Sequence, residues 1–192
     1  LNSTSAYREE NGHDVIYVTM DSHASHWPSL YRYQLGTPTT PDLFQRIGAP
    51  SGMSAMSEGG AAIDSRNGLF VRTATGDLAV WRLANNNPLN PEANVDVGVR
   101  LVDQNGAPID MNLLSSIAYD SVNNQFVIWD SRDRGTVWIT QTTFNLDGSI
   151  APVWVVRRAP STTAAQPVGP HLQGVLGKWK YVLELKAFVA MD

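Results

Sequence analysis

A pair of strands joined by a tight turn recurs four times along this chain, and this repeat constrains the fold more than any other feature. The segments Ala61–Ser65 and Ile117–Ser121 align at an offset of 56 residues (117 minus 61). The equivalent aromatic residues of the four copies are Tyr17, Phe70, Phe126 and Phe188. Self-similarity at such a period predicts an architecture in which one supersecondary unit packs against its neighbours.

Each of the first three copies continues into two further elements. A third apolar strand is predicted over residues 30–35, 78–83 and 137–141, and a fourth element ends in Ala-Pro at 49–50, 107–108 and 159–160. Pro has no backbone N–H to donate, so it suits the end of an outer edge strand. Four strands in about 50 to 60 residues is the repeat of a β-propeller blade.

The second strands read VIYVTM, LFVRT, QFVIW and AFVAM, which are almost continuous apolar runs. A strand that is apolar on both faces is covered on both faces, as stacked blades require. The turns before them carry Asn11-Gly12, Asn67-Gly68 and Asn123-Asn124, residues that tolerate the positive φ of tight hairpins. The small pairs Gly59-Gly60 and Ser115-Ser116 fit a crowded inner strand.

We therefore predict an all-β fold, a β-propeller or partial propeller of four-stranded antiparallel blades, with about 3.5 blades in this chain. Residues 1–192 form a single segment whose blades span approximately 1–50, 51–109, 110–166 and 167–192, the last incomplete. A closed propeller needs at least about four blades. We expect further blades beyond Asp192, or another chain, to cover the open ends.

The segment GVLGKWKYVLELKAFVAMD, residues 174–192, resembles a blade opening of secreted bacterial β-propeller repeat proteins. In that family Tyr-Val-Pro precedes Asn-Ala-Phe, whereas this chain has Leu183 at the Pro position and Lys186 at the Asn position. The match covers about a tenth of the chain and implies no activity. Trp129-Asp130 ends a second strand rather than a third, unlike WD40 repeats, and Gly59-Gly60 occurs once, unlike kelch repeats.

Composition narrows the functional classes. The net charge is −4 and no Lys/Arg run is present, so nucleic acid is not expected as a partner. The absence of cysteine excludes disulfides and thiolate metal sites, and it fits a periplasmic or extracellular protein. No apolar run reaches the roughly 18 residues of a membrane span. No catalytic elbow, P-loop or dinucleotide motif occurs, so no cofactor is predicted.

The predicted ligand-binding residues lie in loops on one rim of the blades, because loops vary while the scaffold stays fixed. The first blade has five extra residues in the loop between its second and third strands, and this insertion contains Trp27. Trp27 could stack on a sugar ring, and Arg132 and Arg134 could bind carboxylates. His171 enters from the loop before the fourth blade.

The same insertion contains Asp21, His23 and His26, the one cluster with metal-ligand chemistry. Imidazole and carboxylate groups bind zinc or similar ions, so a divalent metal is one hypothesis. The alternative is a polar surface loop with solvated histidines.

Two sets of aspartates recur. Asp64 and Asp120 precede hairpin turns, which favours hydrogen bonds to the backbone of their own turns over paired acid–base catalysis. Asp21, Asp130 and Asp192 end second strands, where a turn role again leads over ligand or cation contact. The tryptophans within predicted strands are expected to pack between blades: Trp81, Trp129, Trp138 and Trp179.

Three functions remain open. The leading hypothesis is a non-catalytic binding or scaffold module that engages a protein or glycan through the rim loops, with no catalytic residues. The second is a polysaccharide lyase or hydrolase that uses a rim His/Asp site, an analogy at the level of the fold. The third is a structural subunit of a larger assembly.

Overall fold

The computed structural model describes residues 4–21, 27–52, 59–73, 77–109, 111, 115–130, 136–160 and 179–190. Within these ranges the chain forms β-strands and two short 3-10 helices, so the predicted all-β class is confirmed. The elements are β1 (Thr4–Glu10), β2 (His13–Asp21), β3 (Pro28–Gln34), β4 (Leu43–Pro50), β5 (Ala61–Asp64), β6 (Leu69–Thr73), β7 (Asp77–Arg82), η1 (Leu83–Asn85), η2 (Pro91–Ala93), β8 (Val97–Val102), β9 (Ser116–Asp120), β10 (Gln125–Trp129), β11 (Val137–Thr140), β12 (Val153–Arg158), β13 (Trp179–Val182) and β14 (Ala187–Ala190).

The first group, β1 to β4, is a four-stranded antiparallel sheet in chain order. Its first hairpin turns through Asn11 and Gly12, both at positive φ, as the Asn-Gly pair predicts. In β2 the residues alternate between buried and half-buried positions, because neighbouring side chains of a strand point to opposite faces.

The second group (β5 to β8) and the third group (β9 to β12) are also antiparallel in chain order, but they share one sheet. Their outer strands β8 and β12 pair in parallel, with Leu101 opposite Trp154. The edge strands β5 and β9 also contact each other, which curls the eight strands into a nearly closed, barrel-like sheet. The sequence did not predict this pairing. An outer edge strand has unpaired N–H and C=O groups, and here β8 and β12 hydrogen-bond to each other.

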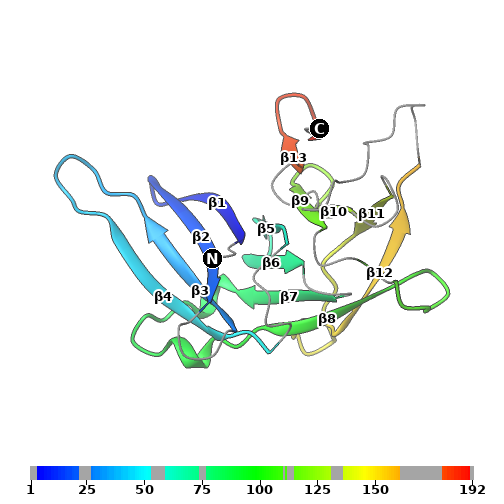
Figure 1. Ribbon diagram of the computed structural model, residues 1–192, viewed down its shortest axis with the longest axis horizontal. Helices are drawn as coiled ribbons and strands as arrows, with labels where there is room; N and C mark the ends of the chain where they lie inside the picture. The colour runs from blue at the N-terminus through cyan, green and yellow to red at the C-terminus, as the bar shows by residue number, and fades with distance from the viewer. Residues whose placement is uncertain are drawn as a thin grey trace.

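The groups follow one another in an arc, with β1, β5 and β9 on its inner side and β4, β8 and β12 along its outer side (Figure 1). Each first strand contacts the next, from β1 to β5, β5 to β9 and β9 to β13. The last two strands, β13 and β14, form a separate hairpin beside the third group.

The core lies in layers between successive groups. Tyr17 and Ile47 of the first group pack with Phe70 and Trp81 of the second. A larger layer between the second and third groups joins residues from β6, β7 and β8 to residues from β9, β10 and β12, including Trp154. The prediction that strand tryptophans pack between groups is confirmed: Trp81, Trp129 and Trp179 are buried, and Trp138 is partly buried against the larger layer.

Tyr17 corrects one detail of the predicted repeat. Tyr17 and Phe70 lie on opposite sides of one layer, with ring centroids 6.4 Å apart. The side chain of Tyr17 therefore faces the following group, whereas Phe70 and Phe126 face the preceding group. The two aromatic positions are not equivalent, because a shift of one residue moves a side chain to the other face of a strand.

The small residues at the starts of the inner strands meet a close approach of backbones, as predicted. A Cβ placed on Gly60 would lie 2.6 Å from the backbone nitrogen of Ile117. Thr73 strengthens the same junction, because its hydroxyl donates to the Ser115 carbonyl at 3.0 Å. Among the described residues, no helix is long and apolar enough to cross a membrane.

Candidate functional site

Two of the predicted site residues lie together at the end of β2. Asp21 is opposite Pro28 in the β2–β3 ladder, so Trp27 directly precedes the residue paired with Asp21. The side chain of Trp27 is 39% exposed, as a surface contact residue requires. This end of the sheet is the predicted rim.

The other predicted site residues, His23, His26, Arg132, Arg134 and His171, lie outside the described residues. Within the described ranges, no group of three or more His, Cys, Asp or Glu side chains is placed to hold a metal ion. A metal site that combines Asp21 with the two histidines therefore stays a prediction, as does the enzymatic alternative.

A buried arginine, which the sequence reading missed, faces Asp21 from the second group. Arg72 is fully buried on β6, two residues after Phe70 and on the same side of the strand. Burial lowers the pKa of Arg72 to about 10, although Asp96 and Asp21 both act to raise it. The guanidinium therefore stays charged at neutral pH, and carboxylates from two different groups act on it electrostatically. The signal was available, because Ile128 is the repeat equivalent of Arg72.

Asp96 ties this charge to the first group. Its carboxylate accepts hydrogen bonds from the Ser51 hydroxyl at 2.6 Å and from the Gly52 backbone N–H at 3.0 Å. One carboxylate oxygen of Asp21 is buried, and no described residue hydrogen-bonds to it. A buried charge needs an opposite charge nearby, so the electrostatic attraction of Arg72 favours this arrangement.

The turn aspartates behave as the sequence predicts. Asp64 accepts backbone hydrogen bonds at 3.0 Å from the residues two and three positions ahead, and a third from the Asn67 side chain at 2.7 Å. Asp120 repeats this pattern, with Asn123 in the role of Asn67 at 2.6 Å. These carboxylates hold their own turns, which is the role that the sequence favours.

The same aspartates also link successive groups. Burial raises the pKa of Tyr119, and a hydrogen bond to Asp64 of the preceding group raises it further. Burial and a hydrogen bond to Asp120 likewise raise the pKa of Tyr181. Asp64 also accepts a 2.6 Å hydrogen bond from Thr142. Burial opposes ionisation of Asp64, but the hydrogen bonds outweigh it and leave the pKa below its ordinary value.

Asp130, at the rim end of the third group, has structural partners outside its own turn. Its carboxylate accepts from the Trp138 indole N–H at 3.3 Å and lies 3.5 Å from the Ser115 hydroxyl. Its backbone N–H donates to the Thr136 carbonyl at 2.9 Å. The side chain is almost fully buried, which leaves it little access to a ligand.

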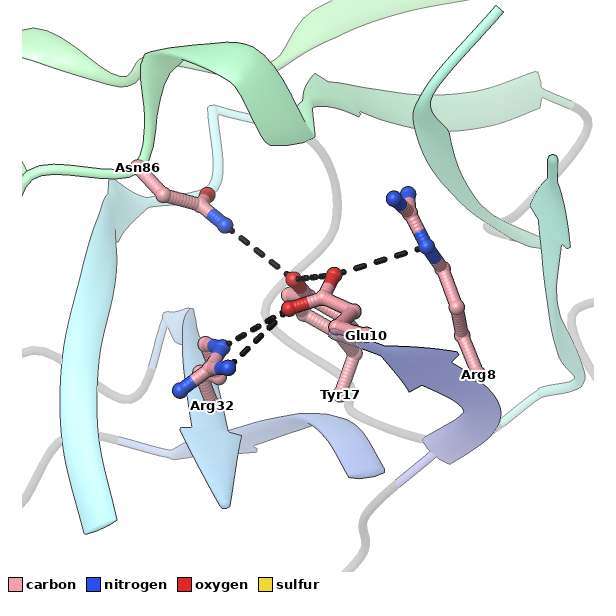
Figure 2. A network of polar contacts seen from close by, with 5 residues as sticks. All are labelled: Arg8, Glu10, Tyr17, Arg32 and Asn86. Carbon is pink, nitrogen blue, oxygen red and sulfur yellow. Dashed lines mark hydrogen bonds and ion pairs between the residues drawn. The ribbon is translucent and has the colours of Figure 1, made fainter. Parts of the chain in front are cut away.

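A polar network joins the first and second groups at the opposite end of the sheets (Figure 2). Glu10 accepts from the Tyr17 hydroxyl at 2.5 Å and from Arg32 through two N–H groups at 3.0 and 3.1 Å. Arg8 adds an ion pair with Glu10 at 3.4 Å, and Asn86 donates to the Tyr17 oxygen at 3.2 Å. These polar groups bond to one another, so the network holds Tyr17 in the core layer between the first and second groups.

An exposed aromatic surface covers the side of the first sheet that faces away from the second group. We call it the first-sheet outer face. Tyr7 is 61% exposed and Phe44 52% exposed, and the rings of Tyr31 and Phe44 stack with centroids 5.2 Å apart. The face consists of Tyr7, Ile16, Val18, Tyr31, Tyr33 and Phe44, which are cross-strand neighbours. No signal in the repeat distinguished it from the covered faces.

A second open surface lies on the third group, on the side away from the second. We call it the third-group open face. It contains a groove of about 360 Å³ lined by Gln104, Gln125, Ile139, Thr140, Gln141, Thr143, Val155, Val156 and Arg157. Val153 and Val155 of β12 are 44% and 56% exposed. Arg157 donates to the Gln125 side chain at 3.3 Å across it.

Comparison with known proteins does not assign the chain to a family. No protein-family model matches it, and no curated protein sequence matches it.

Proposed function

We propose that the chain is a run of consecutive β-propeller blades that acts as a non-catalytic binding module for a glycan or protein. The blades would follow the predicted boundaries at about 1–50, 51–109, 110–166 and 167–192. Two features support this arrangement: the antiparallel order of strands within each group, and the contacts from each first strand to the next. The parallel β8–β12 pairing departs from separate blades and would be a local feature of one junction.

The observation that carries the binding role is the exposed Trp27 at the rim end of a rigid sheet. An indole ring offers a flat apolar surface that suits the C–H face of a sugar, and its N–H can donate a hydrogen bond. Asp21 and the buried Arg72 would hold the strand end in place below it. Arg132 and Arg134 remain the proposed partners for ligand carboxylates, and His171 a further contact. A glycan ligand agrees with the expected periplasmic or extracellular location.

The test is binding of the purified protein to an immobilised panel of neutral and uronic-acid oligosaccharides. Replacement of Trp27→Ala should weaken binding at least about tenfold, since a central aromatic contact contributes on the order of 2 kcal/mol. Trp27→Phe should retain part of the affinity. The double replacement Arg132→Ala/Arg134→Ala should weaken binding of uronic-acid ligands alone.

Phe44→Ala is the matched control, because it removes an exposed aromatic residue from the first-sheet outer face, away from the rim. Equal binding by the Trp27→Ala variant and the unchanged protein would rule out the rim as the glycan site. If no oligosaccharide of the panel binds, a cysteine introduced at position 27 would be used for cross-linking to identify a protein partner.

The structural-subunit alternative also has a specific observation in its favour. Both the first-sheet outer face and the third-group open face expose apolar side chains that contact with another protein surface would bury.

A further inference from the structure

We propose that the first-sheet outer face and the third-group open face are the two halves of one head-to-tail interface between copies of this chain. The proposal rests on the stacking of groups described above and is independent of any ligand at the rim.

Every described layer between groups pairs two kinds of face. One is the face of a group that points to the next group, such as Tyr17 and Ile47 in the first. The other is the face that points back to the preceding group, such as Phe70 and Trp81 in the second. The layer between the second and third groups repeats this rule, with Val71 pointing forward and Phe126 pointing back.

The first-sheet outer face is a backward-pointing face without a described partner group. Tyr17 points forward, so its neighbours Ile16 and Val18 point the other way. Cross-strand pairing places Tyr33 beside Ile16 and Tyr31 beside Val18, which makes the face continuous over three strands with Phe44 opposite Tyr33. Apolar and aromatic side chains form this face, as they form the backward faces of the other groups.

The third-group open face is a forward-pointing face that the described residues cover only in part. Trp179 of β13 packs on Val127 and Trp129, and its indole N–H donates to the Val127 carbonyl at 3.1 Å. The hairpin of β13 and β14 therefore covers β9 and β10. Val153 and Val155, on the outer strand, stay exposed because they alternate with the buried Trp154.

The described residues thus present one open face of each kind, and the pairing rule of the interior matches one to the other. Charge supports the match. Asp14 and Asp42 border the first-sheet outer face, where they accept hydrogen bonds from the hydroxyls of Tyr7 and Tyr33. Arg157 is exposed on the third-group open face. A contact between unlike faces is heterologous, so it closes into a ring or extends as a filament.

The experiment measures the mass of the 192-residue protein by sedimentation and light scattering over a concentration series. The unchanged protein should associate. Phe44→Glu and Val155→Glu each put a carboxylate into one half of the interface and should each raise the dissociation constant at least about tenfold. Both positions are more than half exposed, so circular dichroism should show an unchanged fold.

Mixing the two variants separates this proposal from its rivals. Phe44→Glu keeps an intact third-group open face and Val155→Glu an intact first-sheet outer face, so the mixture should regain association as one-to-one pairs. Leu146→Glu, at a fully exposed turn position, should associate like the unchanged protein. A protein that stays monomeric at its highest soluble concentration, or variants that fail to complement, would overturn the proposal. Binding to the oligosaccharide panel by Phe44→Glu tests the rim separately.

Discussion

At the scale of single residues, side-chain hydrogen bonds hold each group together and link it to the next. Tyr17 shows how burial and a neighbouring carboxylate affect such a hydrogen bond. Burial and the hydrogen bond to Glu10 raise the pKa of Tyr17 to about 12, from an ordinary value of 10.0. The protonated hydroxyl is therefore held more firmly in the folded state than in the unfolded state.

Tyr17→Phe should lower the free energy of unfolding by about 1 kcal/mol, because it removes a hydroxyl that serves both Glu10 and Asn86 while it keeps the ring. A pKa raised on folding contributes stability in full below pH 10, and that contribution is lost as the pH rises towards 12. The free energy of unfolding, measured with urea at each pH, should therefore fall more steeply between pH 10 and 12 for the unchanged protein than for the variant. Parallel curves would contradict the assignment.

Residue identities also show how far the sequence could define the site. The Asx turns of Asp64 and Asp120 were predictable, since they depend on neighbours within three residues along the chain. The carboxylates that act on Arg72 were not, because Asp21 and Asp96 are each more than twenty residues from it along the chain. A charged residue in an otherwise apolar repeat position pointed to the site but could not name its partners.

At the scale of elements, the junction of inner strands depends on a missing side chain. Gly60→Ala would place a methyl group 2.6 Å from the backbone nitrogen of Ile117, and backbone cannot move aside cheaply. We expect a loss of about 1 to 3 kcal/mol in the free energy of unfolding. Gly52→Ala is the matched control, since a Cβ there meets no atom within 4 Å and should change stability by less than about 0.5 kcal/mol. Equal effects at both positions would contradict the close approach.

The one-residue shift of the aromatic position in β2 is also a property of the element. The recurring aromatic–Val pairs correctly located the second strands of all four copies. They misassigned the face of Tyr17, because an alignment by similarity does not detect a slip of one residue, and such a slip reverses every side chain.

At the scale of the whole molecule, the groups share their cores and should unfold together. Trp154 is fully buried between the second and third groups, where it stacks on Phe126 with centroids 6.0 Å apart. Trp154→Ala should cost about 3 to 5 kcal/mol. Because the second group also shares a layer with the first, the whole chain should still unfold in one transition, at lower urea.

Fluorescence and circular dichroism should report the same midpoint for this variant. Trp27→Ala, at the exposed rim, should change the free energy of unfolding by less than about 0.5 kcal/mol. Two separate transitions in the Trp154→Ala variant would show that the groups fold as independent units.

The sequence by itself determined the first three strands of each complete group, the hairpin turns and the packing of the strand tryptophans between groups. These follow from local periodicity and turn chemistry, which act between residues close along the chain. The sequence placed the end of the second group's fourth strand at Pro108, whereas β8 ends at Val102. Only the tertiary structure decided which faces meet, that β8 and β12 join in parallel, and that the carboxylates of Asp21 and Asp96 act on Arg72. Each of these depends on contacts between distant segments, and many distant pairings satisfy the same local pattern.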